Sequence, residues 1–164
     1  MVTRAIAWLC GIALAGCAVE NSPMAPLALD RDYFRCHVQP VLAARCALPA
    51  CHASARRPLS IFAPGRMRWQ VGWDTPTAPI TDYELDSNFG IASGFATSSA
   101  TGEPWLLAKP LAPSAGGYYH RAADLFGSED VFLTKTDVGY QTIASWIAGD
   151  TATSDCTPIT EVGP

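Results

Sequence analysis

The stretch "RCALPACHAS", residues 45–54, decides how the chain is interpreted. It holds two cysteines, Cys46 and Cys51, and His52 follows the second one directly. Four residues separate the cysteines, and Pro49 among them disfavours a continuous helix, so the pattern predicts a loop between the thiols. Two thiols and an imidazole in this order can serve a cofactor, a metal ion or a disulfide-bonded turn.

Attachment of a c-type haem is the interpretation that these residue types favour. Two thiols have to reach the two vinyl groups of one porphyrin edge, and an imidazole directly after the second thiol comes up beneath the iron. Cys51 and His52 keep that geometry, and only the gap before them is longer than the familiar gap of two residues. We therefore predict that Cys46 and Cys51 hold one haem c through thioethers and that His52 is the proximal iron ligand.

Two alternatives use the same residues. A structural zinc site takes four ligands, whereas Cys46, Cys51 and His52 make three, and no second Cys/His pair at metal-binding spacing follows them. A disulfide between Cys46 and Cys51 would leave His52 as a bystander, and this alternative stays open.

The chain begins with "MVTRAIAWLCGIALAGCAVE". Arg4 precedes an apolar run over residues 5–15, which is shorter than the roughly 20 residues that a membrane span needs but has the length of a signal-peptide core. The run ends in "LAGC", which resembles a bacterial lipobox and implies lipidation of Cys17; the alternative is a buried apolar helix with a chance cysteine. We expect a lipoprotein signal peptide over residues 1–16 and a flexible tether over residues 17–30.

These features predict a location and a charge. The mature chain would be lipid-anchored at the periplasmic or surface face of the cell envelope, and Ala18 after the lipidated cysteine weakly favours the outer membrane. Loss of Arg4 leaves 10 basic residues against 15 acidic ones, a net charge of −5. The basic residues are scattered, so nothing indicates a nucleic-acid partner.

The remaining cysteines suggest a disulfide. Of six cysteines, Cys10 lies in the signal peptide and Cys17 takes the lipid, which leaves four in an oxidising compartment. We favour a bond between Cys36 and Cys156, which frees the other two for haem. Four cysteines allow three connectivities, and the sequence alone does not choose among them.

Longer stretches resemble a cytochrome c-like domain of bacterial surface and periplasmic proteins. They are "YFRCHVQPVLAARCALPACHASARRPLSIFAPGR" (33–66), "EPWLLAKPLAPSAGGYYHRAADLF" (103–126) and "YQTIASWIAG" (140–149). The lengthened cysteine gap and Ala53, where glycine is frequent, depart from the family pattern. The resemblance covers most of residues 31–149 and implies an all-α fold: a small cytochrome c-like helical domain over residues 31–157, with long loops around a haem, followed by a tail over residues 158–164.

Periodicity supports a helical domain independently. Apolar residues at helical spacing predict a first helix that runs into Cys46, with Asp32 as a cap and a kink or late start at Pro40. Thr81 and Glu84 form a capping box before a second helix. The last helix is expected to start near Thr136. The apolar positions of the three helices are Phe34, Val38, Val41 and Leu42; Leu85, Phe89, Ala92 and Ala96; and Tyr140, Ile143, Trp146 and Ile147, with Gly149 as the C-cap.

The second axial ligand has to come from a distant segment. His120 is the favoured candidate, because it precedes the last helix and coincides with the "G-G … H" part of the resemblance; the alternative is a surface histidine. Met67 is the runner-up, whereas His37 on the first helix and Met24 in the tether are poorly placed. Phe89, Phe95 and Trp105 could wall a porphyrin or fill a core. Arg56, Arg57, Arg66 and Arg68 could neutralise haem propionates or form a solvated loop face.

These observations predict a lipid-anchored monohaem c-type cytochrome that carries single electrons. No nucleophile–base set or carboxylate pair indicates an enzyme, although a peroxidase-like or gas-binding haem stays open if the distal position is open. The sequence does not identify the redox partner. The alternative function is a non-redox surface lipoprotein, an interaction or structural module held by two disulfides.

Overall fold

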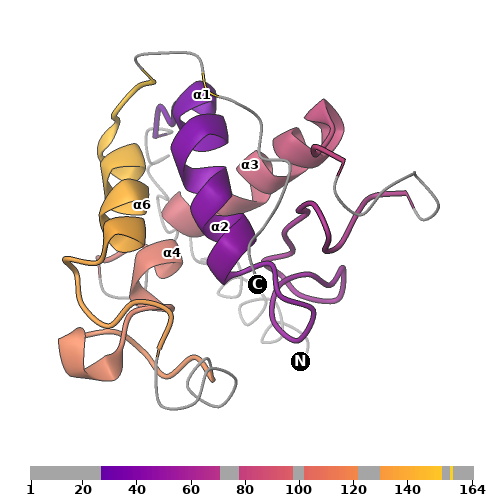
Figure 1. The fold of residues 1–164 in the computed structure, drawn as a ribbon. Helices are drawn as coiled ribbons and strands as arrows, with labels where there is room; N and C mark the ends of the chain where they lie inside the picture. The colour runs from indigo at the N-terminus through magenta and orange to yellow at the C-terminus, as the bar shows by residue number, and fades with distance from the viewer. Residues whose placement is uncertain (1–26, 71–77, 98–101, 122–129, 153–155, 157–164) are drawn as a thin grey trace, which may run out of the picture.

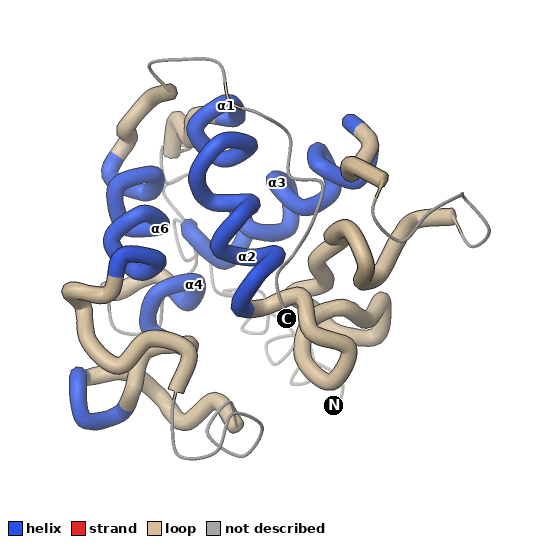
Figure 2. The backbone as a smooth tube through the Cα atoms, in the orientation of Figure 1, coloured by secondary structure: helices blue, strands red, loops and turns tan. Residues whose placement is uncertain are grey.

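The computed structural model describes residues 27–70, 78–97, 102–121, 130–152 and 156. Helices and loops make up this part of the chain, and it contains no strand; a single parallel bridge joins Leu111 to Phe132 (Figures 1 and 2). The expected all-helical architecture is therefore confirmed for these residues. The helical elements are α1 (Arg31–Tyr33), η1 (Phe34–Val38), α2 (Gln39–Arg45), α3 (Asp82–Thr97), α4 (Trp105–Ala108), η2 (Pro113–Ala115) and α6 (Val138–Ala148).

The first three elements form one continuous rod that ends at the motif (Figure 1). Asp30 caps it, because its carboxylate accepts a hydrogen bond from the Tyr33 amide; Asp32, the expected cap, lies inside the first turn. The rod widens to a π-helical turn at η1, where the Gln39 amide donates to the Phe34 carbonyl. Pro40 follows this turn. A wider turn is one way to accommodate a proline, which has no N–H to donate and whose ring crowds the preceding turn.

Helix α3 begins at the predicted capping box. The Thr81 amide donates to Glu84 Oε2 over 2.8 Å, and the Glu84 amide donates back to Thr81 Oγ1 over 3.2 Å. Of the predicted apolar face, Leu85, Ala92 and Ala96 are buried and Phe89 is partly buried. Asn88, beside this face, is buried as well. The Asn88 amide group donates to Gln39 Oε1 and to the Phe62 carbonyl, and the Phe62 amide donates to Asn88 Oδ1. These bonds attach the long loop after the motif to two helices.

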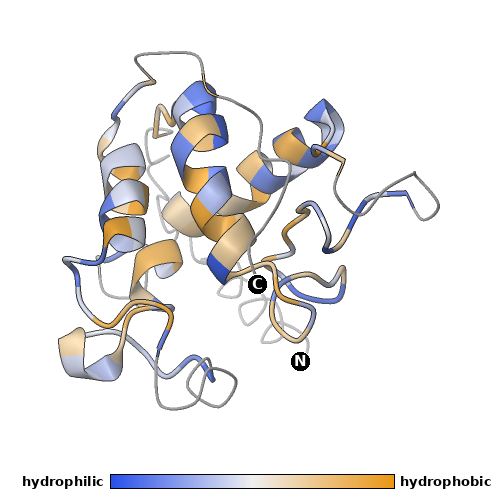
Figure 3. Ribbon diagram, viewed as in Figure 1, coloured by the Kyte–Doolittle hydropathy of each residue, from blue (hydrophilic) through white to orange (hydrophobic). Residues whose placement is uncertain are grey.

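Helix α6 packs its apolar face against the first rod, and the apolar faces of the helices turn inward (Figure 3). Trp146 is fully buried; its ring lies against Phe34, and its Nε1 donates to the Asp30 carbonyl. Asp137 caps the helix, which begins slightly later than the expected start near Thr136. Gly149 ends the helix with a φ of 101°, a left-handed conformation that glycine adopts without steric penalty.

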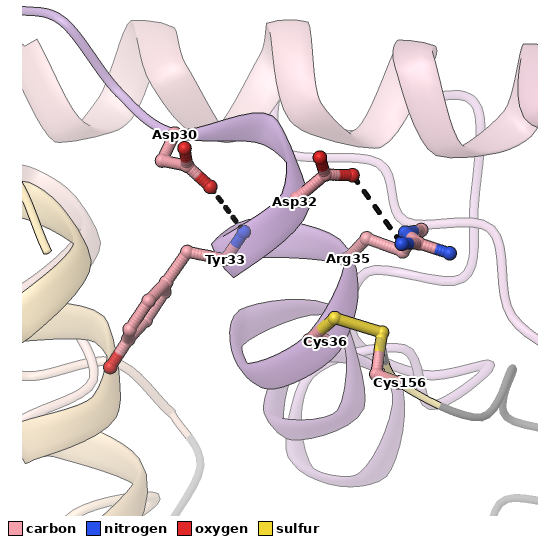
Figure 4. Close-up of a disulfide and its surroundings, with 6 residues drawn as sticks. All are labelled: Asp30, Asp32, Tyr33, Arg35, Cys36 and Cys156. Carbon is pink, nitrogen blue, oxygen red and sulfur yellow. Dashed lines mark hydrogen bonds and ion pairs between the residues drawn. A yellow bond between two sulfur atoms is a disulfide. The ribbon is translucent and has the colours of Figure 1, made fainter. Parts of the chain in front are cut away.

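A disulfide joins Cys36 of η1 to Cys156, which confirms the favoured pairing (Figure 4). It fastens the chain beyond α6 to the beginning of the first rod. Cys17, Met24, the expected signal peptide and the tail over residues 158–164 lie outside the described residues, as does most of the expected tether. Among the described residues, no helix is both long enough and apolar enough to span a membrane.

Candidate cofactor site

The lengthened motif folds into a closed loop at the end of α2. The Cys46 amide still donates to the Leu42 carbonyl over 2.9 Å, so the first cysteine sits on the last helical turn. The chain then turns within the gap, where the Cys51 amide donates to the Leu48 carbonyl over 2.8 Å. Finally, the His52 amide donates to the Cys46 carbonyl over 3.1 Å. This turn accommodates the four residues between the cysteines, so that His52 lies next to the end of α2.

A second loop fixes the ring of His52. Its Nδ1 lies 2.6 Å from the Leu59 carbonyl oxygen, and the Ile61 amide donates to the His52 carbonyl over 2.8 Å. Because a carbonyl only accepts hydrogen bonds, Nδ1 must carry the proton. The lone pair of the neutral ring is therefore on Nε2, which is free to bind a metal ion.

His120 lies on a non-helical segment that rests on the end of α4. The Tyr118 amide donates to the Ala108 carbonyl over 3.1 Å, and Lys109 Nζ donates to the Tyr119 carbonyl over 3.0 Å. Gly117 packs so closely that a Cβ atom there would lie 1.9 Å from the Leu111 carbonyl oxygen. The segment that carries His120 is thus held at several points before the histidine.

The two histidines come together in space. Their ring centroids are 5.7 Å apart, and the ring planes differ by 19°. Nδ1 of His120 is buried and has no hydrogen-bond partner among the described residues. Two imidazoles on opposite sides of one metal ion, each with a metal–nitrogen bond of about 2.0 Å, would have ring centroids roughly 6 Å apart. The observed centroid separation is close to that value, and the two rings are stacked with nearly parallel planes.

His52 and His120 both line a partly open cavity of about 300 Å³, a volume within the range of cofactor and ligand sites. Of the three aromatic residues for which a cavity wall and a core stayed open, Phe95 and Trp105 line the cavity. Phe89 packs in the core against Phe34 and Trp146. The cavity is lined mainly by apolar groups, and its lining residues are Leu42, Cys46, His52, Pro58, Leu59, Phe95, Trp105, Leu106, Lys109, Pro110, His120, Phe132 and Ile143.

The other candidate ligands lie elsewhere. Met67 is not among the cavity-lining residues; its carbonyl accepts from the Ala63 amide in the long loop. His37 is exposed on the first rod, where its ring lies against Tyr33. Of the sulfur and imidazole groups considered for the distal position and placed in the structure, only His120 faces His52.

Burial sets the protonation states around the cavity. Desolvation lowers the pKa of both His52 and His120 below the ordinary histidine value, so both rings are neutral at pH 7, the form that binds metals. Burial raises the pKa of the Cys46 thiol to about 12 and also raises that of Cys51. Both thiols are free, so Cys46 and Cys51 are not bonded to one another here.

Across the described ranges, no group of three or more His, Cys, Asp or Glu side chains is placed to hold a metal ion. A zinc site would require such a group. His52 and His120 are the two imidazoles that the structure brings together beside the cavity.

Two polar interactions were missed in the sequence analysis. Arg68, considered for haem propionates, instead binds the buried Glu84 through Nε and Nη2, with Nε 2.9 Å from Oε1. The hydrogen bond from His52 to the Leu59 carbonyl was missed too, because a backbone acceptor leaves no signal in side-chain pattern. The capping box was a clue to the first, because a capping glutamate that is buried needs a cation nearby.

No family model, curated protein or solved structure matches this chain.

Proposed function

We propose that this chain is a lipid-anchored monohaem c-type cytochrome that carries single electrons in the cell envelope. The observation that carries the proposal is the pair of facing imidazoles, His52 and His120, across an apolar cavity beside the Cys46–Cys51 loop. The cytochrome c-like fold and the haem are part of the proposal. What supports them is the helical architecture with long loops and the match between the site and the needs of a covalently held haem.

The thiols and imidazoles that the chain supplies at this site fit the attachment and ligation of a haem c. Cys46 and Cys51 are free thiols next to the cavity, so they could form the two thioethers. His52 would bind the iron through Nε2, since the Leu59 carbonyl holds its Nδ1 proton. His120, a half-buried ring whose buried Nδ1 has no partner among the described residues, would supply the second imidazole for the iron. When bound, the haem supplies the one-electron redox chemistry.

The protein's contribution would be ligation and exclusion of water. Two histidine ligands favour a lower reduction potential than a histidine and a thioether, because a thioether raises it. Leu42, Phe132 and Ile143 are apolar residues in the cavity lining and would limit the access of water to a bound haem. With His52 and His120 both serving as ligands, the role would be electron transfer rather than catalysis on a bound substrate.

The proposed location rests on the sequence of residues 1–20. The lipid at Cys17 would anchor the domain to the membrane, with the outer membrane favoured. Fractionation of wild type against Cys17→Ser tests this, with the variant expected to move from the membrane to the soluble fraction. A wild type that is already soluble and retains residues 1–16 would contradict the anchor.

The haem itself is tested by expression in a host that attaches c-type haem. Wild type should be red and keep its haem through denaturing electrophoresis. Cys51→Ala should lose nearly all covalent haem, Cys46→Ala should keep at most one thioether, and His52→Ala should lose the low-spin visible bands. His37→Ala is the matched control, since this exposed histidine lies away from the cavity, and it should have the wild-type spectrum.

Two results would overturn the haem proposal. One is a His52→Ala spectrum identical to that of wild type. The other is colourless wild-type protein in which peptide mapping finds a Cys46–Cys51 disulfide; this would favour the non-redox, disulfide-held surface lipoprotein instead.

A further inference from the structure

Two exposed aromatic side chains, Trp69 and Tyr83, meet at the start of α3, and neither lines the cofactor cavity. Trp69 is 57% exposed and Tyr83 is 54% exposed, and a cluster of large exposed rings is more informative than a single one. Their ring centroids lie 4.7 Å apart and the planes are inclined by 49°, so neither ring lies flat against the other. The pair forms an aromatic ledge that leaves more than half of each side chain open to solvent.

Both rings of the aromatic ledge are held in place by the fold. The Trp69 amide donates to Glu84 Oε1 over 2.8 Å, and the buried Phe62 ring meets the indole edge to face, with the centroids 6.3 Å apart. Tyr83 is the second residue of α3, whose start is fixed by the capping box of Thr81 and Glu84. Because the rings are already ordered, a ligand that stacks on them would lose little binding free energy to their ordering.

A partly open pocket of about 240 Å³ includes the aromatic ledge in its wall. Its lining residues are Arg68, Trp69, Gln70, Thr81, Tyr83 and Glu84. Three polar groups of this lining make no hydrogen bond with the described residues: the indole N–H of Trp69, the side-chain amide of Gln70 and the hydroxyl of Tyr83. Together they offer a ligand both donors and acceptors.

The two charged groups of the lining neutralise each other. Arg68 Nε lies 2.9 Å from Glu84 Oε1, and the two side chains are 16% and 3% exposed. The other Arg68 nitrogens donate to the carbonyls of Ala78 and Pro79, and Glu84 Oε2 accepts from Arg68 Nη2 and from the Thr81 amide. An ionic ligand would find no unpaired charge of opposite sign in this lining, whereas a neutral ligand rich in hydroxyl groups could use the free donors and acceptors.

We propose that the aromatic ledge and its pocket bind one ring of a neutral saccharide chain, at a site separate from the cofactor cavity. One face of a sugar ring carries C–H groups that pack against an aromatic ring, while the hydroxyl groups at its edge form hydrogen bonds. Trp69 and Tyr83 would supply the stacking surface, and the Gln70 amide would bind hydroxyl groups. The site does not require the haem.

A membrane surface is the competing occupant, because exposed Trp and Tyr side chains also favour the membrane–water interface. The charges beside the aromatic ledge argue against it. Asp82 precedes Tyr83, and Asp86 lies on the same helix face three residues further on; their side chains are 96% and 59% exposed. Insertion of the Tyr83 ring into a membrane would take these carboxylates out of water, which is costly for a charged group.

Isothermal titration calorimetry of the full-length protein, in a detergent without a sugar headgroup, tests the site. The probes are maltotriose, cellotriose and triacetylchitotriose, which differ in linkage and substituents but carry no charge. We expect at least one of them to bind with a dissociation constant in about the millimolar range, since a small pocket contacts few atoms of the ligand. Deacetylated chitotriose, a cation, and trigalacturonic acid, an anion, should bind less tightly than the neutral probe.

Variants of exposed aromatic residues locate the binding. Tyr83→Ala should weaken the affinity for the saccharide by about tenfold, because it removes one stacking ring. Tyr119→Ala is the matched control; Tyr119 is 62% exposed but does not line the pocket, so the affinity should stay as in wild type. Trp69→Ala should lose measurable binding, and Trp69→Phe should retain part of it. Because Trp69 also packs against Phe62, unfolding midpoints are compared, and Tyr83→Ala decides the matter if Trp69→Ala does not fold.

Four outcomes would overturn the saccharide site. They are no binding of any neutral probe at about 10 mM, equal binding to wild type and Tyr83→Ala, tighter binding of a charged probe, and a membrane role for the aromatic ledge. The last is measured with the Cys17→Ser variant and vesicles of phosphatidylethanolamine and phosphatidylglycerol. Co-sedimentation that Trp69→Ala removes, without binding of any trisaccharide, would assign the aromatic ledge to the membrane. None of these measurements depends on covalent haem, so the site and the proposed function fail separately.

Discussion

The Nδ1 atom of His52 lies 2.6 Å from the carbonyl oxygen of Leu59. Through this contact, the loop that carries Leu59 fixes the position of the His52 ring, although the loop itself contributes no candidate metal ligand. The loop is in turn fixed through Phe62, whose backbone amide and carbonyl bind Asn88. The candidate ligand is therefore oriented by a chain of contacts that ends in the buried face of α3.

The first prediction concerns His120 as the distal ligand. In the haem-loaded protein, His120→Ala should open a coordination position that binds carbon monoxide in the reduced state. His120→Met should keep six-coordination and raise the reduction potential, because a thioether favours the reduced iron. Visible spectroscopy and potentiometry measure both effects. Met67→Ala is the control and should change neither. Loss of a near-infrared sulfur-to-iron band in Met67→Ala, with an unaltered His120→Ala spectrum, would reverse the assignment.

The second prediction concerns the close contact at Gly117. An added Cβ would lie 1.9 Å from the Leu111 carbonyl oxygen, so Gly117→Ala has to displace the segment that leads to His120. We expect a loss of about 1–3 kcal/mol in the free energy of unfolding, the usual cost of overpacking. Urea denaturation measures it.

Gly94→Ala is the matched control for Gly117→Ala. Gly94 lies inside α3, and nothing is within 4 Å of the position of an added Cβ. Alanine favours the helix there and should raise the free energy of unfolding by about 0.5–1 kcal/mol. Equal effects of the two substitutions would show that the contact with Leu111 does not constrain the segment.

The third prediction concerns the buried carboxylate of Glu84. Burial alone would raise its pKa, but hydrogen bonds from Arg68 and from the amides of Thr81 and Trp69 lower the pKa below its ordinary value. A lowered pKa in the folded state contributes stability that is present above about pH 4.3, the unfolded value, and is lost as the pH falls through the folded value. Glu84→Gln should cost about 3–5 kcal/mol at pH 7, since it leaves the largely buried Arg68 without its carboxylate partner and only with backbone carbonyls, and less at pH 3.

Denaturant unfolding at several pH values measures this dependence. The exposed Asp150 just after α6 serves as the control, because Asp150→Asn also removes one negative charge, and it should change the free energy of unfolding by no more than a few tenths of a kcal/mol. A Glu84→Gln variant with the same acid sensitivity as wild type would contradict the role given to the pair.

The fourth prediction concerns the disulfide between Cys36 and Cys156. Its sequence separation is 120, so it encloses nearly all of the described residues. Replacement of both cysteines by serine should lower the free energy of unfolding by on the order of 4–5 kcal/mol if the chain-entropy account holds. Guanidinium denaturation of the double variant tests this. Reduction of the wild type should have a matching effect, whereas a reductant that leaves its unfolding midpoint unchanged would show that the bond contributes little.

The elements that the sequence predicted well are those set by local pattern. The capping box at Thr81 and Glu84 marked the start of α3, and the spacing of Tyr140, Ile143 and Trp146 marked the buried face of α6. Asp30 was missed as the first cap because Asp32 has the same side chain, and only the backbone geometry decides which of the two lies outside the first turn.

For the candidate site, the sequence indicated the residues but not the contacts that arrange them. Cys46, Cys51 and His52 form a local string, so their proximity follows from the sequence, and His120 was singled out by its position before the last helix. The contacts that arrange them were not foreseeable. The approach of Leu59 to His52, and of Lys109 to the Tyr119 carbonyl, depends on loop paths that no periodicity encodes.

The widened turn at η1 also acts as an angular spacer between two cysteines with different tasks. An α-helix advances about 100° per residue, so removal of one residue from Phe34–Val38 would rotate everything before the turn by about that angle relative to α2. Cys36 would then turn out of phase with Cys156 while Cys46 kept its place at the cavity. The extra residue in this turn therefore lets one rod present a sulfur atom to the disulfide at one end and another to the candidate cofactor site at the other.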